Sequence, residues 1–192
     1  PLIFMVMSSL KPSQQLLVDS GSLRAFLPVG DISLNNYTMA FQRAPVGLFV
    51  MNSLIVTGVT VLSSLFLCSL AGFSIAILDW KGKAVVLSAI LATLTVPFET
   101  IAVPLLLMSS KLPWIGMEGL EFGWLDSYRV QIIPFIADGL TIFLFVQYFR
   151  DLPRDLIEAA RVEGASWWTV YSKVLMPLSG PVIATAAILK FL

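Results

Sequence analysis

The sequence has no histidine, a single cysteine and few charged residues. Without histidine the chain cannot build a Ser-His-Asp triad, a zinc site with a histidine ligand or a histidine proton shuttle. Cys68 has no partner for an internal disulfide, and it lies in an apolar run where a free cysteine packs as a small hydrophobic residue. A formal net charge of zero gives no bulk attraction to acidic or basic partners.

Apolar residues take the place of the missing charges. Charged residues make up 12% of the 192 residues, whereas they make up about a quarter of a typical soluble domain. The AVILMFWYC class makes up 57%, and the mean hydropathy is +0.88. This composition argues against a soluble enzyme, a nucleic-acid-binding protein and a disordered tail. Because the long apolar runs lack period-two alternation, we expect an all-α polytopic membrane protein that contacts the lipid bilayer and no nucleic acid.

The apolar runs and the charged connections predict the order of segments in a single transmembrane domain, residues 1–192. A bilayer core needs about 20 mostly apolar residues in a helix. The chain opens and closes inside apolar stretches, so we expect it to be truncated at both ends. Basic residues are denser in two connections, which predicts that these lie in the cytoplasm. The expected segments are the end of a first span (1–10), an outer loop (11–47), a span (48–78), a short cytoplasmic connection (79–83), a span (84–109), an outer loop (110–131), a span (132–149), a cytoplasmic loop (150–176) and a partial span (177–192).

The charged loop, residues 150–176, carries the signals of two helices. Pro153 suits a first helical turn, because its missing N–H has no helical partner there. Acidic residues follow, and Gly164 suits a helix stop. We therefore predict a helix over residues 153–163 and a second helix capped by Ser166. A helix this short, with little apolar surface, is either a docking element for a soluble protein or an amphipathic connector on the bilayer.

The same loop resembles the EAA loop of binding-protein-dependent ABC importer permeases. Glu158-Ala159-Ala160 is followed by Glu163-Gly164-Ala165 and later by Pro177. Glu163 stands where Asp is commoner in the family, and this change keeps the charge. Other segments resemble the carbohydrate branch of the family, the maltose-type second permease: Asn35-Asn36-Tyr37, Asn52-Ser53-Leu54, Leu70-Ala71-Gly72-Phe73, Val96-Pro97-Phe98-Glu99 with Pro104, and Phe149-Arg150-Asp151-Leu152-Pro153.

The resemblance implies the type I fold of ABC importer permeases, truncated at both ends, in a multi-pass protein of the bacterial inner membrane. It implies a permease subunit with no enzyme activity and no cofactor, which forms half of the translocation path for a sugar or sugar derivative. The implied partners are a cytoplasmic ABC ATPase dimer, a second permease subunit and an extracytoplasmic solute-binding protein. The sequence has no Walker A pattern, so the energy would come from another polypeptide. By the resemblance, coupling to the ATPase would use a set of residues in the cytoplasmic EAA loop and just after it: Glu158, Ala159, Ala160, Glu163, Gly164, Ala165 and Pro177.

Polar residues within the expected spans are candidates for the translocation path. Glu99 lies between two prolines, which free backbone carbonyls, so we expect a kinked helix that lines a cavity. Asp138 and Asn52 are further candidates, because polar groups at membrane depth usually face a bundle interior. Each could instead make an interhelical hydrogen bond. Lys190 is expected either to face the path or to pair with an acidic residue.

Three other functions fit parts of the sequence. The first is a permease for a non-sugar solute such as an amino acid, phosphate or peptide. The second is a membrane scaffold whose charged loop recruits a soluble partner without transport. The third is an intramembrane enzyme that uses Glu99 and Asp138 as an acid pair, but these residues lie on different spans and no nucleophile motif is near.

Overall fold

The computed structural model describes residues 1–116 and 119–192, and it divides the chain into two compact units. The first unit comprises Pro1–Leu54 and the second comprises Ile55–Leu192. Among the described residues the fold is helical, apart from one two-stranded hairpin. The expected all-α polytopic fold is therefore confirmed, with a hairpin that the sequence did not predict.

The first unit is organised around a buried lysine. It contains α1 (Leu2–Ser9), α2 (Ser13–Asp19), the 3₁₀ turn η1 (Leu23–Phe26) and α3 (Asn35–Arg43). The Lys11 side chain is fully buried, and its Nζ donates to Asp19 Oδ2 at 2.9 Å and to the Arg24 carbonyl at 2.6 Å. The Asn36 amide donates to the carbonyls of Ser9 and Lys11. The segment expected as an outer loop, 11–47, thus contains short helices held largely by polar contacts.

Among the residues that the structure describes, two helical segments are long and apolar enough to cross a membrane by themselves. They are α4 (Val46–Ala76), which has 31 residues, and the segment Tyr128–Asp151. The second segment consists of α7 (Tyr128–Ile132), the 3₁₀ turn η2 (Ile133–Phe135) and α8 (Gly139–Asp151). Up to four spans result if each of two bent helix pairs counts as one. The expected boundaries of the membrane segments stay predictions.

The first bent pair is α5 (Lys83–Thr93) and α6 (Phe98–Ser109), whose axes differ by 99°. Pro97 is the residue before α6 and has an extended backbone. Because proline disfavours helical geometry in the preceding residue, the helix ends before it. Pro104 is accommodated inside α6. The predicted break in this segment is confirmed, and it lies before Pro97.

The hairpin lies in the segment expected as the second outer loop, 110–131. Strands β1 (Pro113–Gly116) and β2 (Gly119–Phe122) pair in antiparallel register, with Pro113 opposite Phe122. The ring of Trp114, a residue of β1, contacts the Trp124 ring at 6.2 Å between centroids. The Arg129 guanidinium lies 4.5 Å from the centroid of the Trp114 ring. These aromatic contacts provide apolar cover for a two-stranded ladder, which is marginal by itself.

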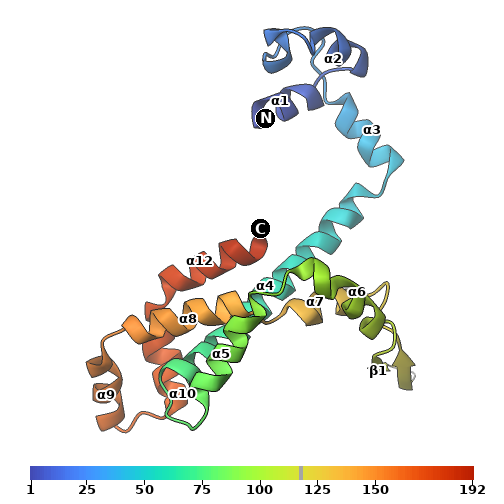
Figure 1. Cartoon of the computed structure of the whole chain (residues 1–192). Coiled ribbons are helices and arrows are strands. Elements are labelled where there is room, and N and C mark those ends of the chain that lie inside the picture. The colour runs from blue at the N-terminus through green and yellow to red at the C-terminus, as the bar shows by residue number, and fades with distance from the viewer. Residues whose placement is uncertain (117–118) are drawn as a thin grey trace. The chain divides into compact units, whose positions relative to one another are not determined.

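The rest of the second unit continues through short helices to the C-terminus (Figure 1). The main core joins α4, α8 and the segment after α9, and its fully buried members include Phe145, Phe149 and Leu175. At Gly72 of α4 an added Cβ would lie 2.6 Å from Phe145 Cβ, so only glycine permits this helix approach. The elements after α8 are α9 (Arg154–Val162), α10 (Trp167–Thr169), the π-helical η3 (Val170–Leu175), α11 (Met176–Leu178) and α12 (Gly180–Phe191).

Candidate functional site

The charged loop forms the short helix that the sequence predicted. Helix α9 spans Arg154–Val162, and Pro153 is its N-cap rather than its first helical residue. Gly164 has φ +84°, a left-handed conformation in which a side chain is strained. Ser166 then accepts a hydrogen bond from the Thr169 N–H and caps α10, as predicted. The two helices are therefore joined by a tight turn, which we call the coupling turn (Glu163–Ser166).

The coupling turn is held by an arginine, Arg161, near the end of α9. Arg161 donates from a guanidinium nitrogen to the Ala165 carbonyl at 2.6 Å. The same guanidinium lies 4.4 Å from the centroid of the Trp167 ring. The Ala165 N–H also donates to the Ala160 carbonyl at 3.0 Å. Arg161 thus connects α9 to α10 across the turn, and this contact exists only because the chain reverses at Gly164.

The segment after the turn is tied to α4. The Tyr171 hydroxyl and the Ser69 hydroxyl are 2.8 Å apart and buried. The Phe73 ring packs against the rings of Tyr171 and Trp167, with centroid distances of 5.4 and 6.4 Å. A hydroxyl pair buried in an apolar core is costly to separate, because each group would lose its partner. The element from α9 to η3, which we call the coupling element, is therefore anchored to a long apolar helix.

The coupling element presents one face outward and one inward. Glu158, Ala159 and Glu163 are exposed. Ala160 and Ala165 are half-buried and pack against the main core, together with Ile157, which is buried. The resemblance implies that both alanines of the EAA motif take part in coupling to an ATPase. Ala160 is half-buried against the core of its own chain, and Ala159 lies on the outer face. Their coupling roles stay predictions.

A cavity of about 210 Å³ lies beneath α9, between it and the ends of α4, α5 and α8. Glu158 lines it together with basic side chains. Asp79 also lines it and forms an ion pair with Lys83 at 2.8 Å. This lysine lowers the pKa of the Asp79 carboxyl by hydrogen bonding and by its charge. The basic side chains that line the cavity are Lys83, Arg150, Arg154 and Arg161.

Pro177 lies in α11 and is exposed. Proline offers no N–H to the carbonyl four residues earlier, which belongs to Lys173. Lys173 is within the π-helical segment η3, in which hydrogen bonds join residues five positions apart instead of four. This change in hydrogen-bond spacing accommodates the N–H that Pro177 lacks. The helical segment Trp167–Leu178 then meets α12 at an angle of 77°. Pro177 therefore precedes a bend that redirects the chain from the coupling element into α12.

A second polar site lies at the other end of α8. Asp138 is the N-cap of α8, and its carboxylate accepts from the N–H and hydroxyl of Thr141, both at 2.9 Å. It also forms an ion pair with Lys190 of α12, with 2.8 Å between Oδ2 and Nζ. Pairing with an acidic residue was one of two expectations for Lys190, and it is confirmed. Both residues line a cavity of about 500 Å³.

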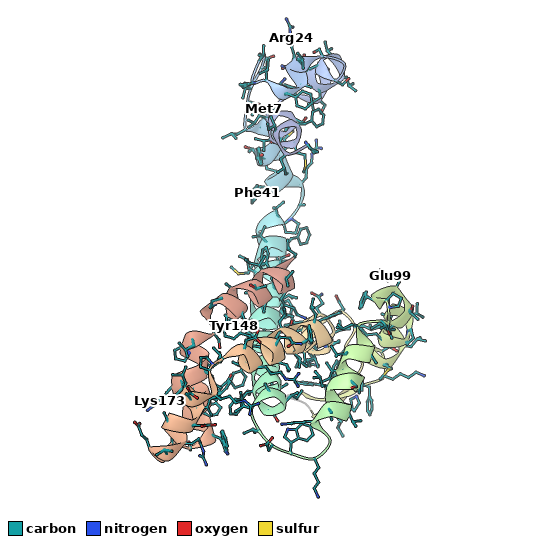
Figure 2. All side chains as sticks on the ribbon, turned by 60° about the vertical axis from the view of Figure 1, so that its left-hand side comes forward. Met7, Arg24, Phe41, Glu99, Tyr148 and Lys173 are labelled. Atoms are coloured by element: carbon teal, nitrogen blue, oxygen red, sulfur yellow. The ribbon has the colours of Figure 1, made fainter. Side chains whose placement is uncertain are left out.

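The other two path candidates lie elsewhere. Glu99 is exposed in the first turn of α6 and is not among the residues lining the cavity at Asp138. Figure 2 shows Glu99 on the opposite side of the second unit from Tyr148 and Lys173. Asn52 is half-buried on the part of α4 that belongs to the first unit. The path-lining roles of Glu99 and Asn52 stay predictions. Within the described residues, no group of three Cys, Asp or Glu side chains is placed to hold a metal ion.

Comparison with known families and proteins gives consistent results. Residues 68–192 match the family described as the binding-protein-dependent transport system inner membrane component. The arabinooligosaccharides transport system permease protein AraQ of Halalkalibacterium halodurans is 31% identical, covering 99% of this chain and 64% of that protein. The melibiose/raffinose/stachyose import permease protein MelC of Bacillus subtilis is 29% identical, covering 83% of this chain and 55% of that protein. The chain thus spans less than two thirds of the length of these relatives.

A solved structure shares the fold. It is that of a bacterial ABC transporter involved in the import of the acidic polysaccharide alginate. The TM-score is 0.79 at 21% identity, and the match covers all of this chain and 62% of the other. The expected fold of an ABC importer permease is therefore confirmed for the chain described here.

Proposed function

Because the chain belongs to the family of binding-protein-dependent transport system inner membrane components, we propose that it is a permease subunit of an ATP-driven sugar importer. One observation carries this proposal. The coupling element presents Glu158, Ala159 and Glu163 on its outer face, while Tyr171 anchors it to α4 through Ser69 and Phe73. This combination of an exposed docking face and a rigid anchor fits transmission of movement from a soluble partner.

Rigidity is necessary for this role. A partner shifts a conformational equilibrium only by the difference between its interaction free energies with the two states. If the loop moved independently of the membrane spans, docking of the partner on the loop would not change the conformation of the spans. The bond between Arg161 and the Ala165 carbonyl, and the ring contact with Trp167, join α9 to α10. Movement of α9 would then be passed on to α4 and to the rest of the second unit.

The partners in this proposal follow from the family and from the charge distribution. The coupling element would face the cytoplasm, where basic residues of membrane proteins are concentrated, and would dock on an ABC ATPase dimer. A second permease subunit would complete the translocation path, and an extracytoplasmic solute-binding protein would deliver the solute. The relatives AraQ and MelC are named for arabino-oligosaccharides and for melibiose, raffinose and stachyose. These names support a saccharide over an amino acid, phosphate or peptide.

The experiment compares two glycines that share a left-handed backbone. Gly164 has φ +84° and Gly82 has φ +97°, so an aspartate at either position imposes similar backbone strain. Gly82 lies in the connection between α4 and α5, apart from the coupling turn. We expect Gly164→Asp in the full-length complex to insert normally but to abolish ATP-dependent uptake of raffinose and arabinotriose and to weaken ATPase binding. Gly82→Asp should retain uptake.

The results separate the candidate functions. Normal uptake by Gly164→Asp would contradict the docking role of the turn. ATP-dependent uptake of an amino acid or phosphate, with none of either sugar, would support the non-sugar permease. ATPase binding without uptake of any solute by the wild-type complex would support the scaffold.

A further inference from the structure

The cavity beside Asp138 has the properties of a small-ligand site. Its volume of about 500 Å³ lies within the range of about 300–1,000 Å³ that is common for ligand pockets. Its walls come from α5, α6, η2, α8 and α12. Most of the lining is apolar, and the polar groups are concentrated at Asp138, Lys190 and Thr93. An apolar cavity with a few convergent polar groups is the usual form of a ligand pocket.

The cap of α8 does not require the charge of Asp138 or its ion pair with Lys190. Asp138 caps α8 by accepting from the Thr141 N–H, a role that Ser, Thr or Asn fulfils equally well without a charge. Charged groups at membrane depth are costly and usually serve function. The two side chains retain 34% and 16% of their surface, for Asp138 and Lys190 respectively, and both line the cavity. Lys190 uses one N–H toward Asp138, and an ammonium has further donors for a ligand.

Two aromatic rings complete the site. Phe98 of α6 and Phe135 of η2 line the same cavity, with ring centroids 5.7 Å apart and planes inclined by 51°. A pyranose or furanose ring presents C–H groups on its face and hydroxyls at its edge. The C–H face suits a phenyl ring, and the hydroxyls suit a carboxylate acceptor and an ammonium donor. Because the Asp138–Lys190 pair is neutral as a unit, it offers no net charge to offset the desolvation of a charged ligand.

We propose that this cavity is a binding subsite for an uncharged sugar unit, with Asp138 and Lys190 holding its hydroxyl groups and Phe98 and Phe135 flanking its ring. The subsite rests on the proposed transport function and gives it a substrate class, neutral rather than acidic saccharides. If the ion pair only held α8 against α12, it would stabilise the fold without influencing the charge of the preferred sugar. Mutations in the pair would then reduce stability but would not change which sugar is preferred.

The test measures binding to the complete full-length complex in lipid nanodiscs, without the solute-binding protein. The probes are raffinose, digalacturonate and the disaccharide of glucosamine, which are neutral, anionic and cationic. Wild type should bind raffinose in preference to both charged sugars. Asp138→Asn leaves the Lys190 charge unbalanced, so raffinose affinity should fall about tenfold and digalacturonate affinity should rise. Lys190→Met should shift the preference toward the glucosamine disaccharide.

Control variants test whether the change in sugar preference depends on the Asp138–Lys190 pair. Asp31→Asn and Lys111→Met remove one charge of each sign at exposed positions, and both should keep the wild-type order of affinities. The charge-exchanged variant, Asp138→Lys with Lys190→Asp, restores the charge balance but not the cap of α8, because an ammonium accepts no hydrogen bond. It should not regain the wild-type raffinose affinity, because the ligand would meet the charges in exchanged places. Size-exclusion chromatography reports whether each variant has folded and assembled.

Two results would overturn the subsite. One is an unchanged order of affinities in both single variants. The other is equal loss of all three sugars in the single variants with an equal, partial recovery of all three in the exchanged variant, which is the pattern of a structural ion pair. Failure of the proposed function is a separate result, namely a wild-type complex that takes up no sugar with ATP. A wild type that imports raffinose while the variants keep its preference would refute the subsite alone.

Discussion

The two ends of α8 differ in packing. Toward its C-terminal half, Phe145 and Val146 are completely buried, with exposed fractions of 0%, and they pack away from the cavity of about 210 Å³ beneath α9. At its N-terminal end, Asp138 borders a cavity of about 500 Å³. A close-packed region transmits displacement, because its side chains leave no space into which to relax. A hollow region with a few polar groups can accept a ligand. One helix thus connects a region suited to transmit movement with a region suited to bind a solute.

The largest effect is expected where α4 meets α8 in the packed region. Gly72→Ala adds a Cβ 2.6 Å from Phe145 Cβ, which should destabilise the chain by about 1–3 kcal/mol through overpacking. Gly58→Ala is a matched control on the same helix, because an added Cβ there would have no atom within 4 Å apart from its chain neighbours and the backbone of its own helix. Thermal unfolding of the detergent-solubilised complex would measure both variants. Equal stability of the two would show that the α4–α8 approach is looser than described.

An intermediate effect is expected at the coupling turn. Arg161→Lys keeps the charge but removes the planar group that lies over Trp167 and bonds the Ala165 carbonyl. We expect a local loss of about 1 kcal/mol and a lower ratio of sugar imported to ATP hydrolysed, with the cavity at Asp138 unaffected. Arg154→Lys, at the opposite end of α9, is the control. An unchanged transport ratio in Arg161→Lys would show that this contact does not stiffen the turn.

The smallest effect is expected in the first unit, outside both regions. Hydrogen bonding from Lys11 lowers the pKa of the Asp19 carboxyl below its ordinary value. The ionised carboxylate therefore stabilises the fold, fully so above the unfolded pKa, and this contribution is lost as the pH falls through the lower folded pKa, below about pH 4. Hydrogen exchange of residues 11–26, corrected for intrinsic rates, should increase there. Asp19→Asn should remove this pH dependence, and a persisting dependence would assign it to another group.

Local signals in the sequence predicted much of the coupling element. Pro153, Gly164 and Ser166 each act on backbone within a few residues, so the extent of α9, its stop and the cap of α10 follow from composition and order. The proline at position 97 similarly predicted the break between α5 and α6. These features depend on the backbone φ preferences of proline and glycine and on the N–H that proline lacks. They can therefore be predicted without knowledge of the tertiary structure.

The contacts that define the two sites could not be predicted in the same way. Ser69 and Tyr171 are separated by 102 positions, and Asp138 and Lys190 by 52. Nothing in the local sequence selects these partners, since each pairing depends on how the helices pack. The hairpin is a further example, because its short strands lack a long alternating pattern and the Trp114 ring of β1 contacts Trp124 and Arg129 from outside the strands. Glu99, chosen from its neighbouring prolines, is exposed on α6 and does not line the cavity at Asp138, so its path-lining role stays a prediction.

Crosslinking tests most directly whether the coupling element docks on an ATPase. Single cysteines at positions 158–164 would be placed in the full-length complex, where the native Cys68 is fully buried. Leu120→Cys, on the exposed hairpin residue, provides the control for the opposite side of the membrane. We predict ATPase crosslinks from several of the positions 158–164, Glu158→Cys among them, and external labelling only of Leu120→Cys. Labelling of positions 158–164 from outside the cell, or the absence of ATPase crosslinks from all of them, would contradict the account.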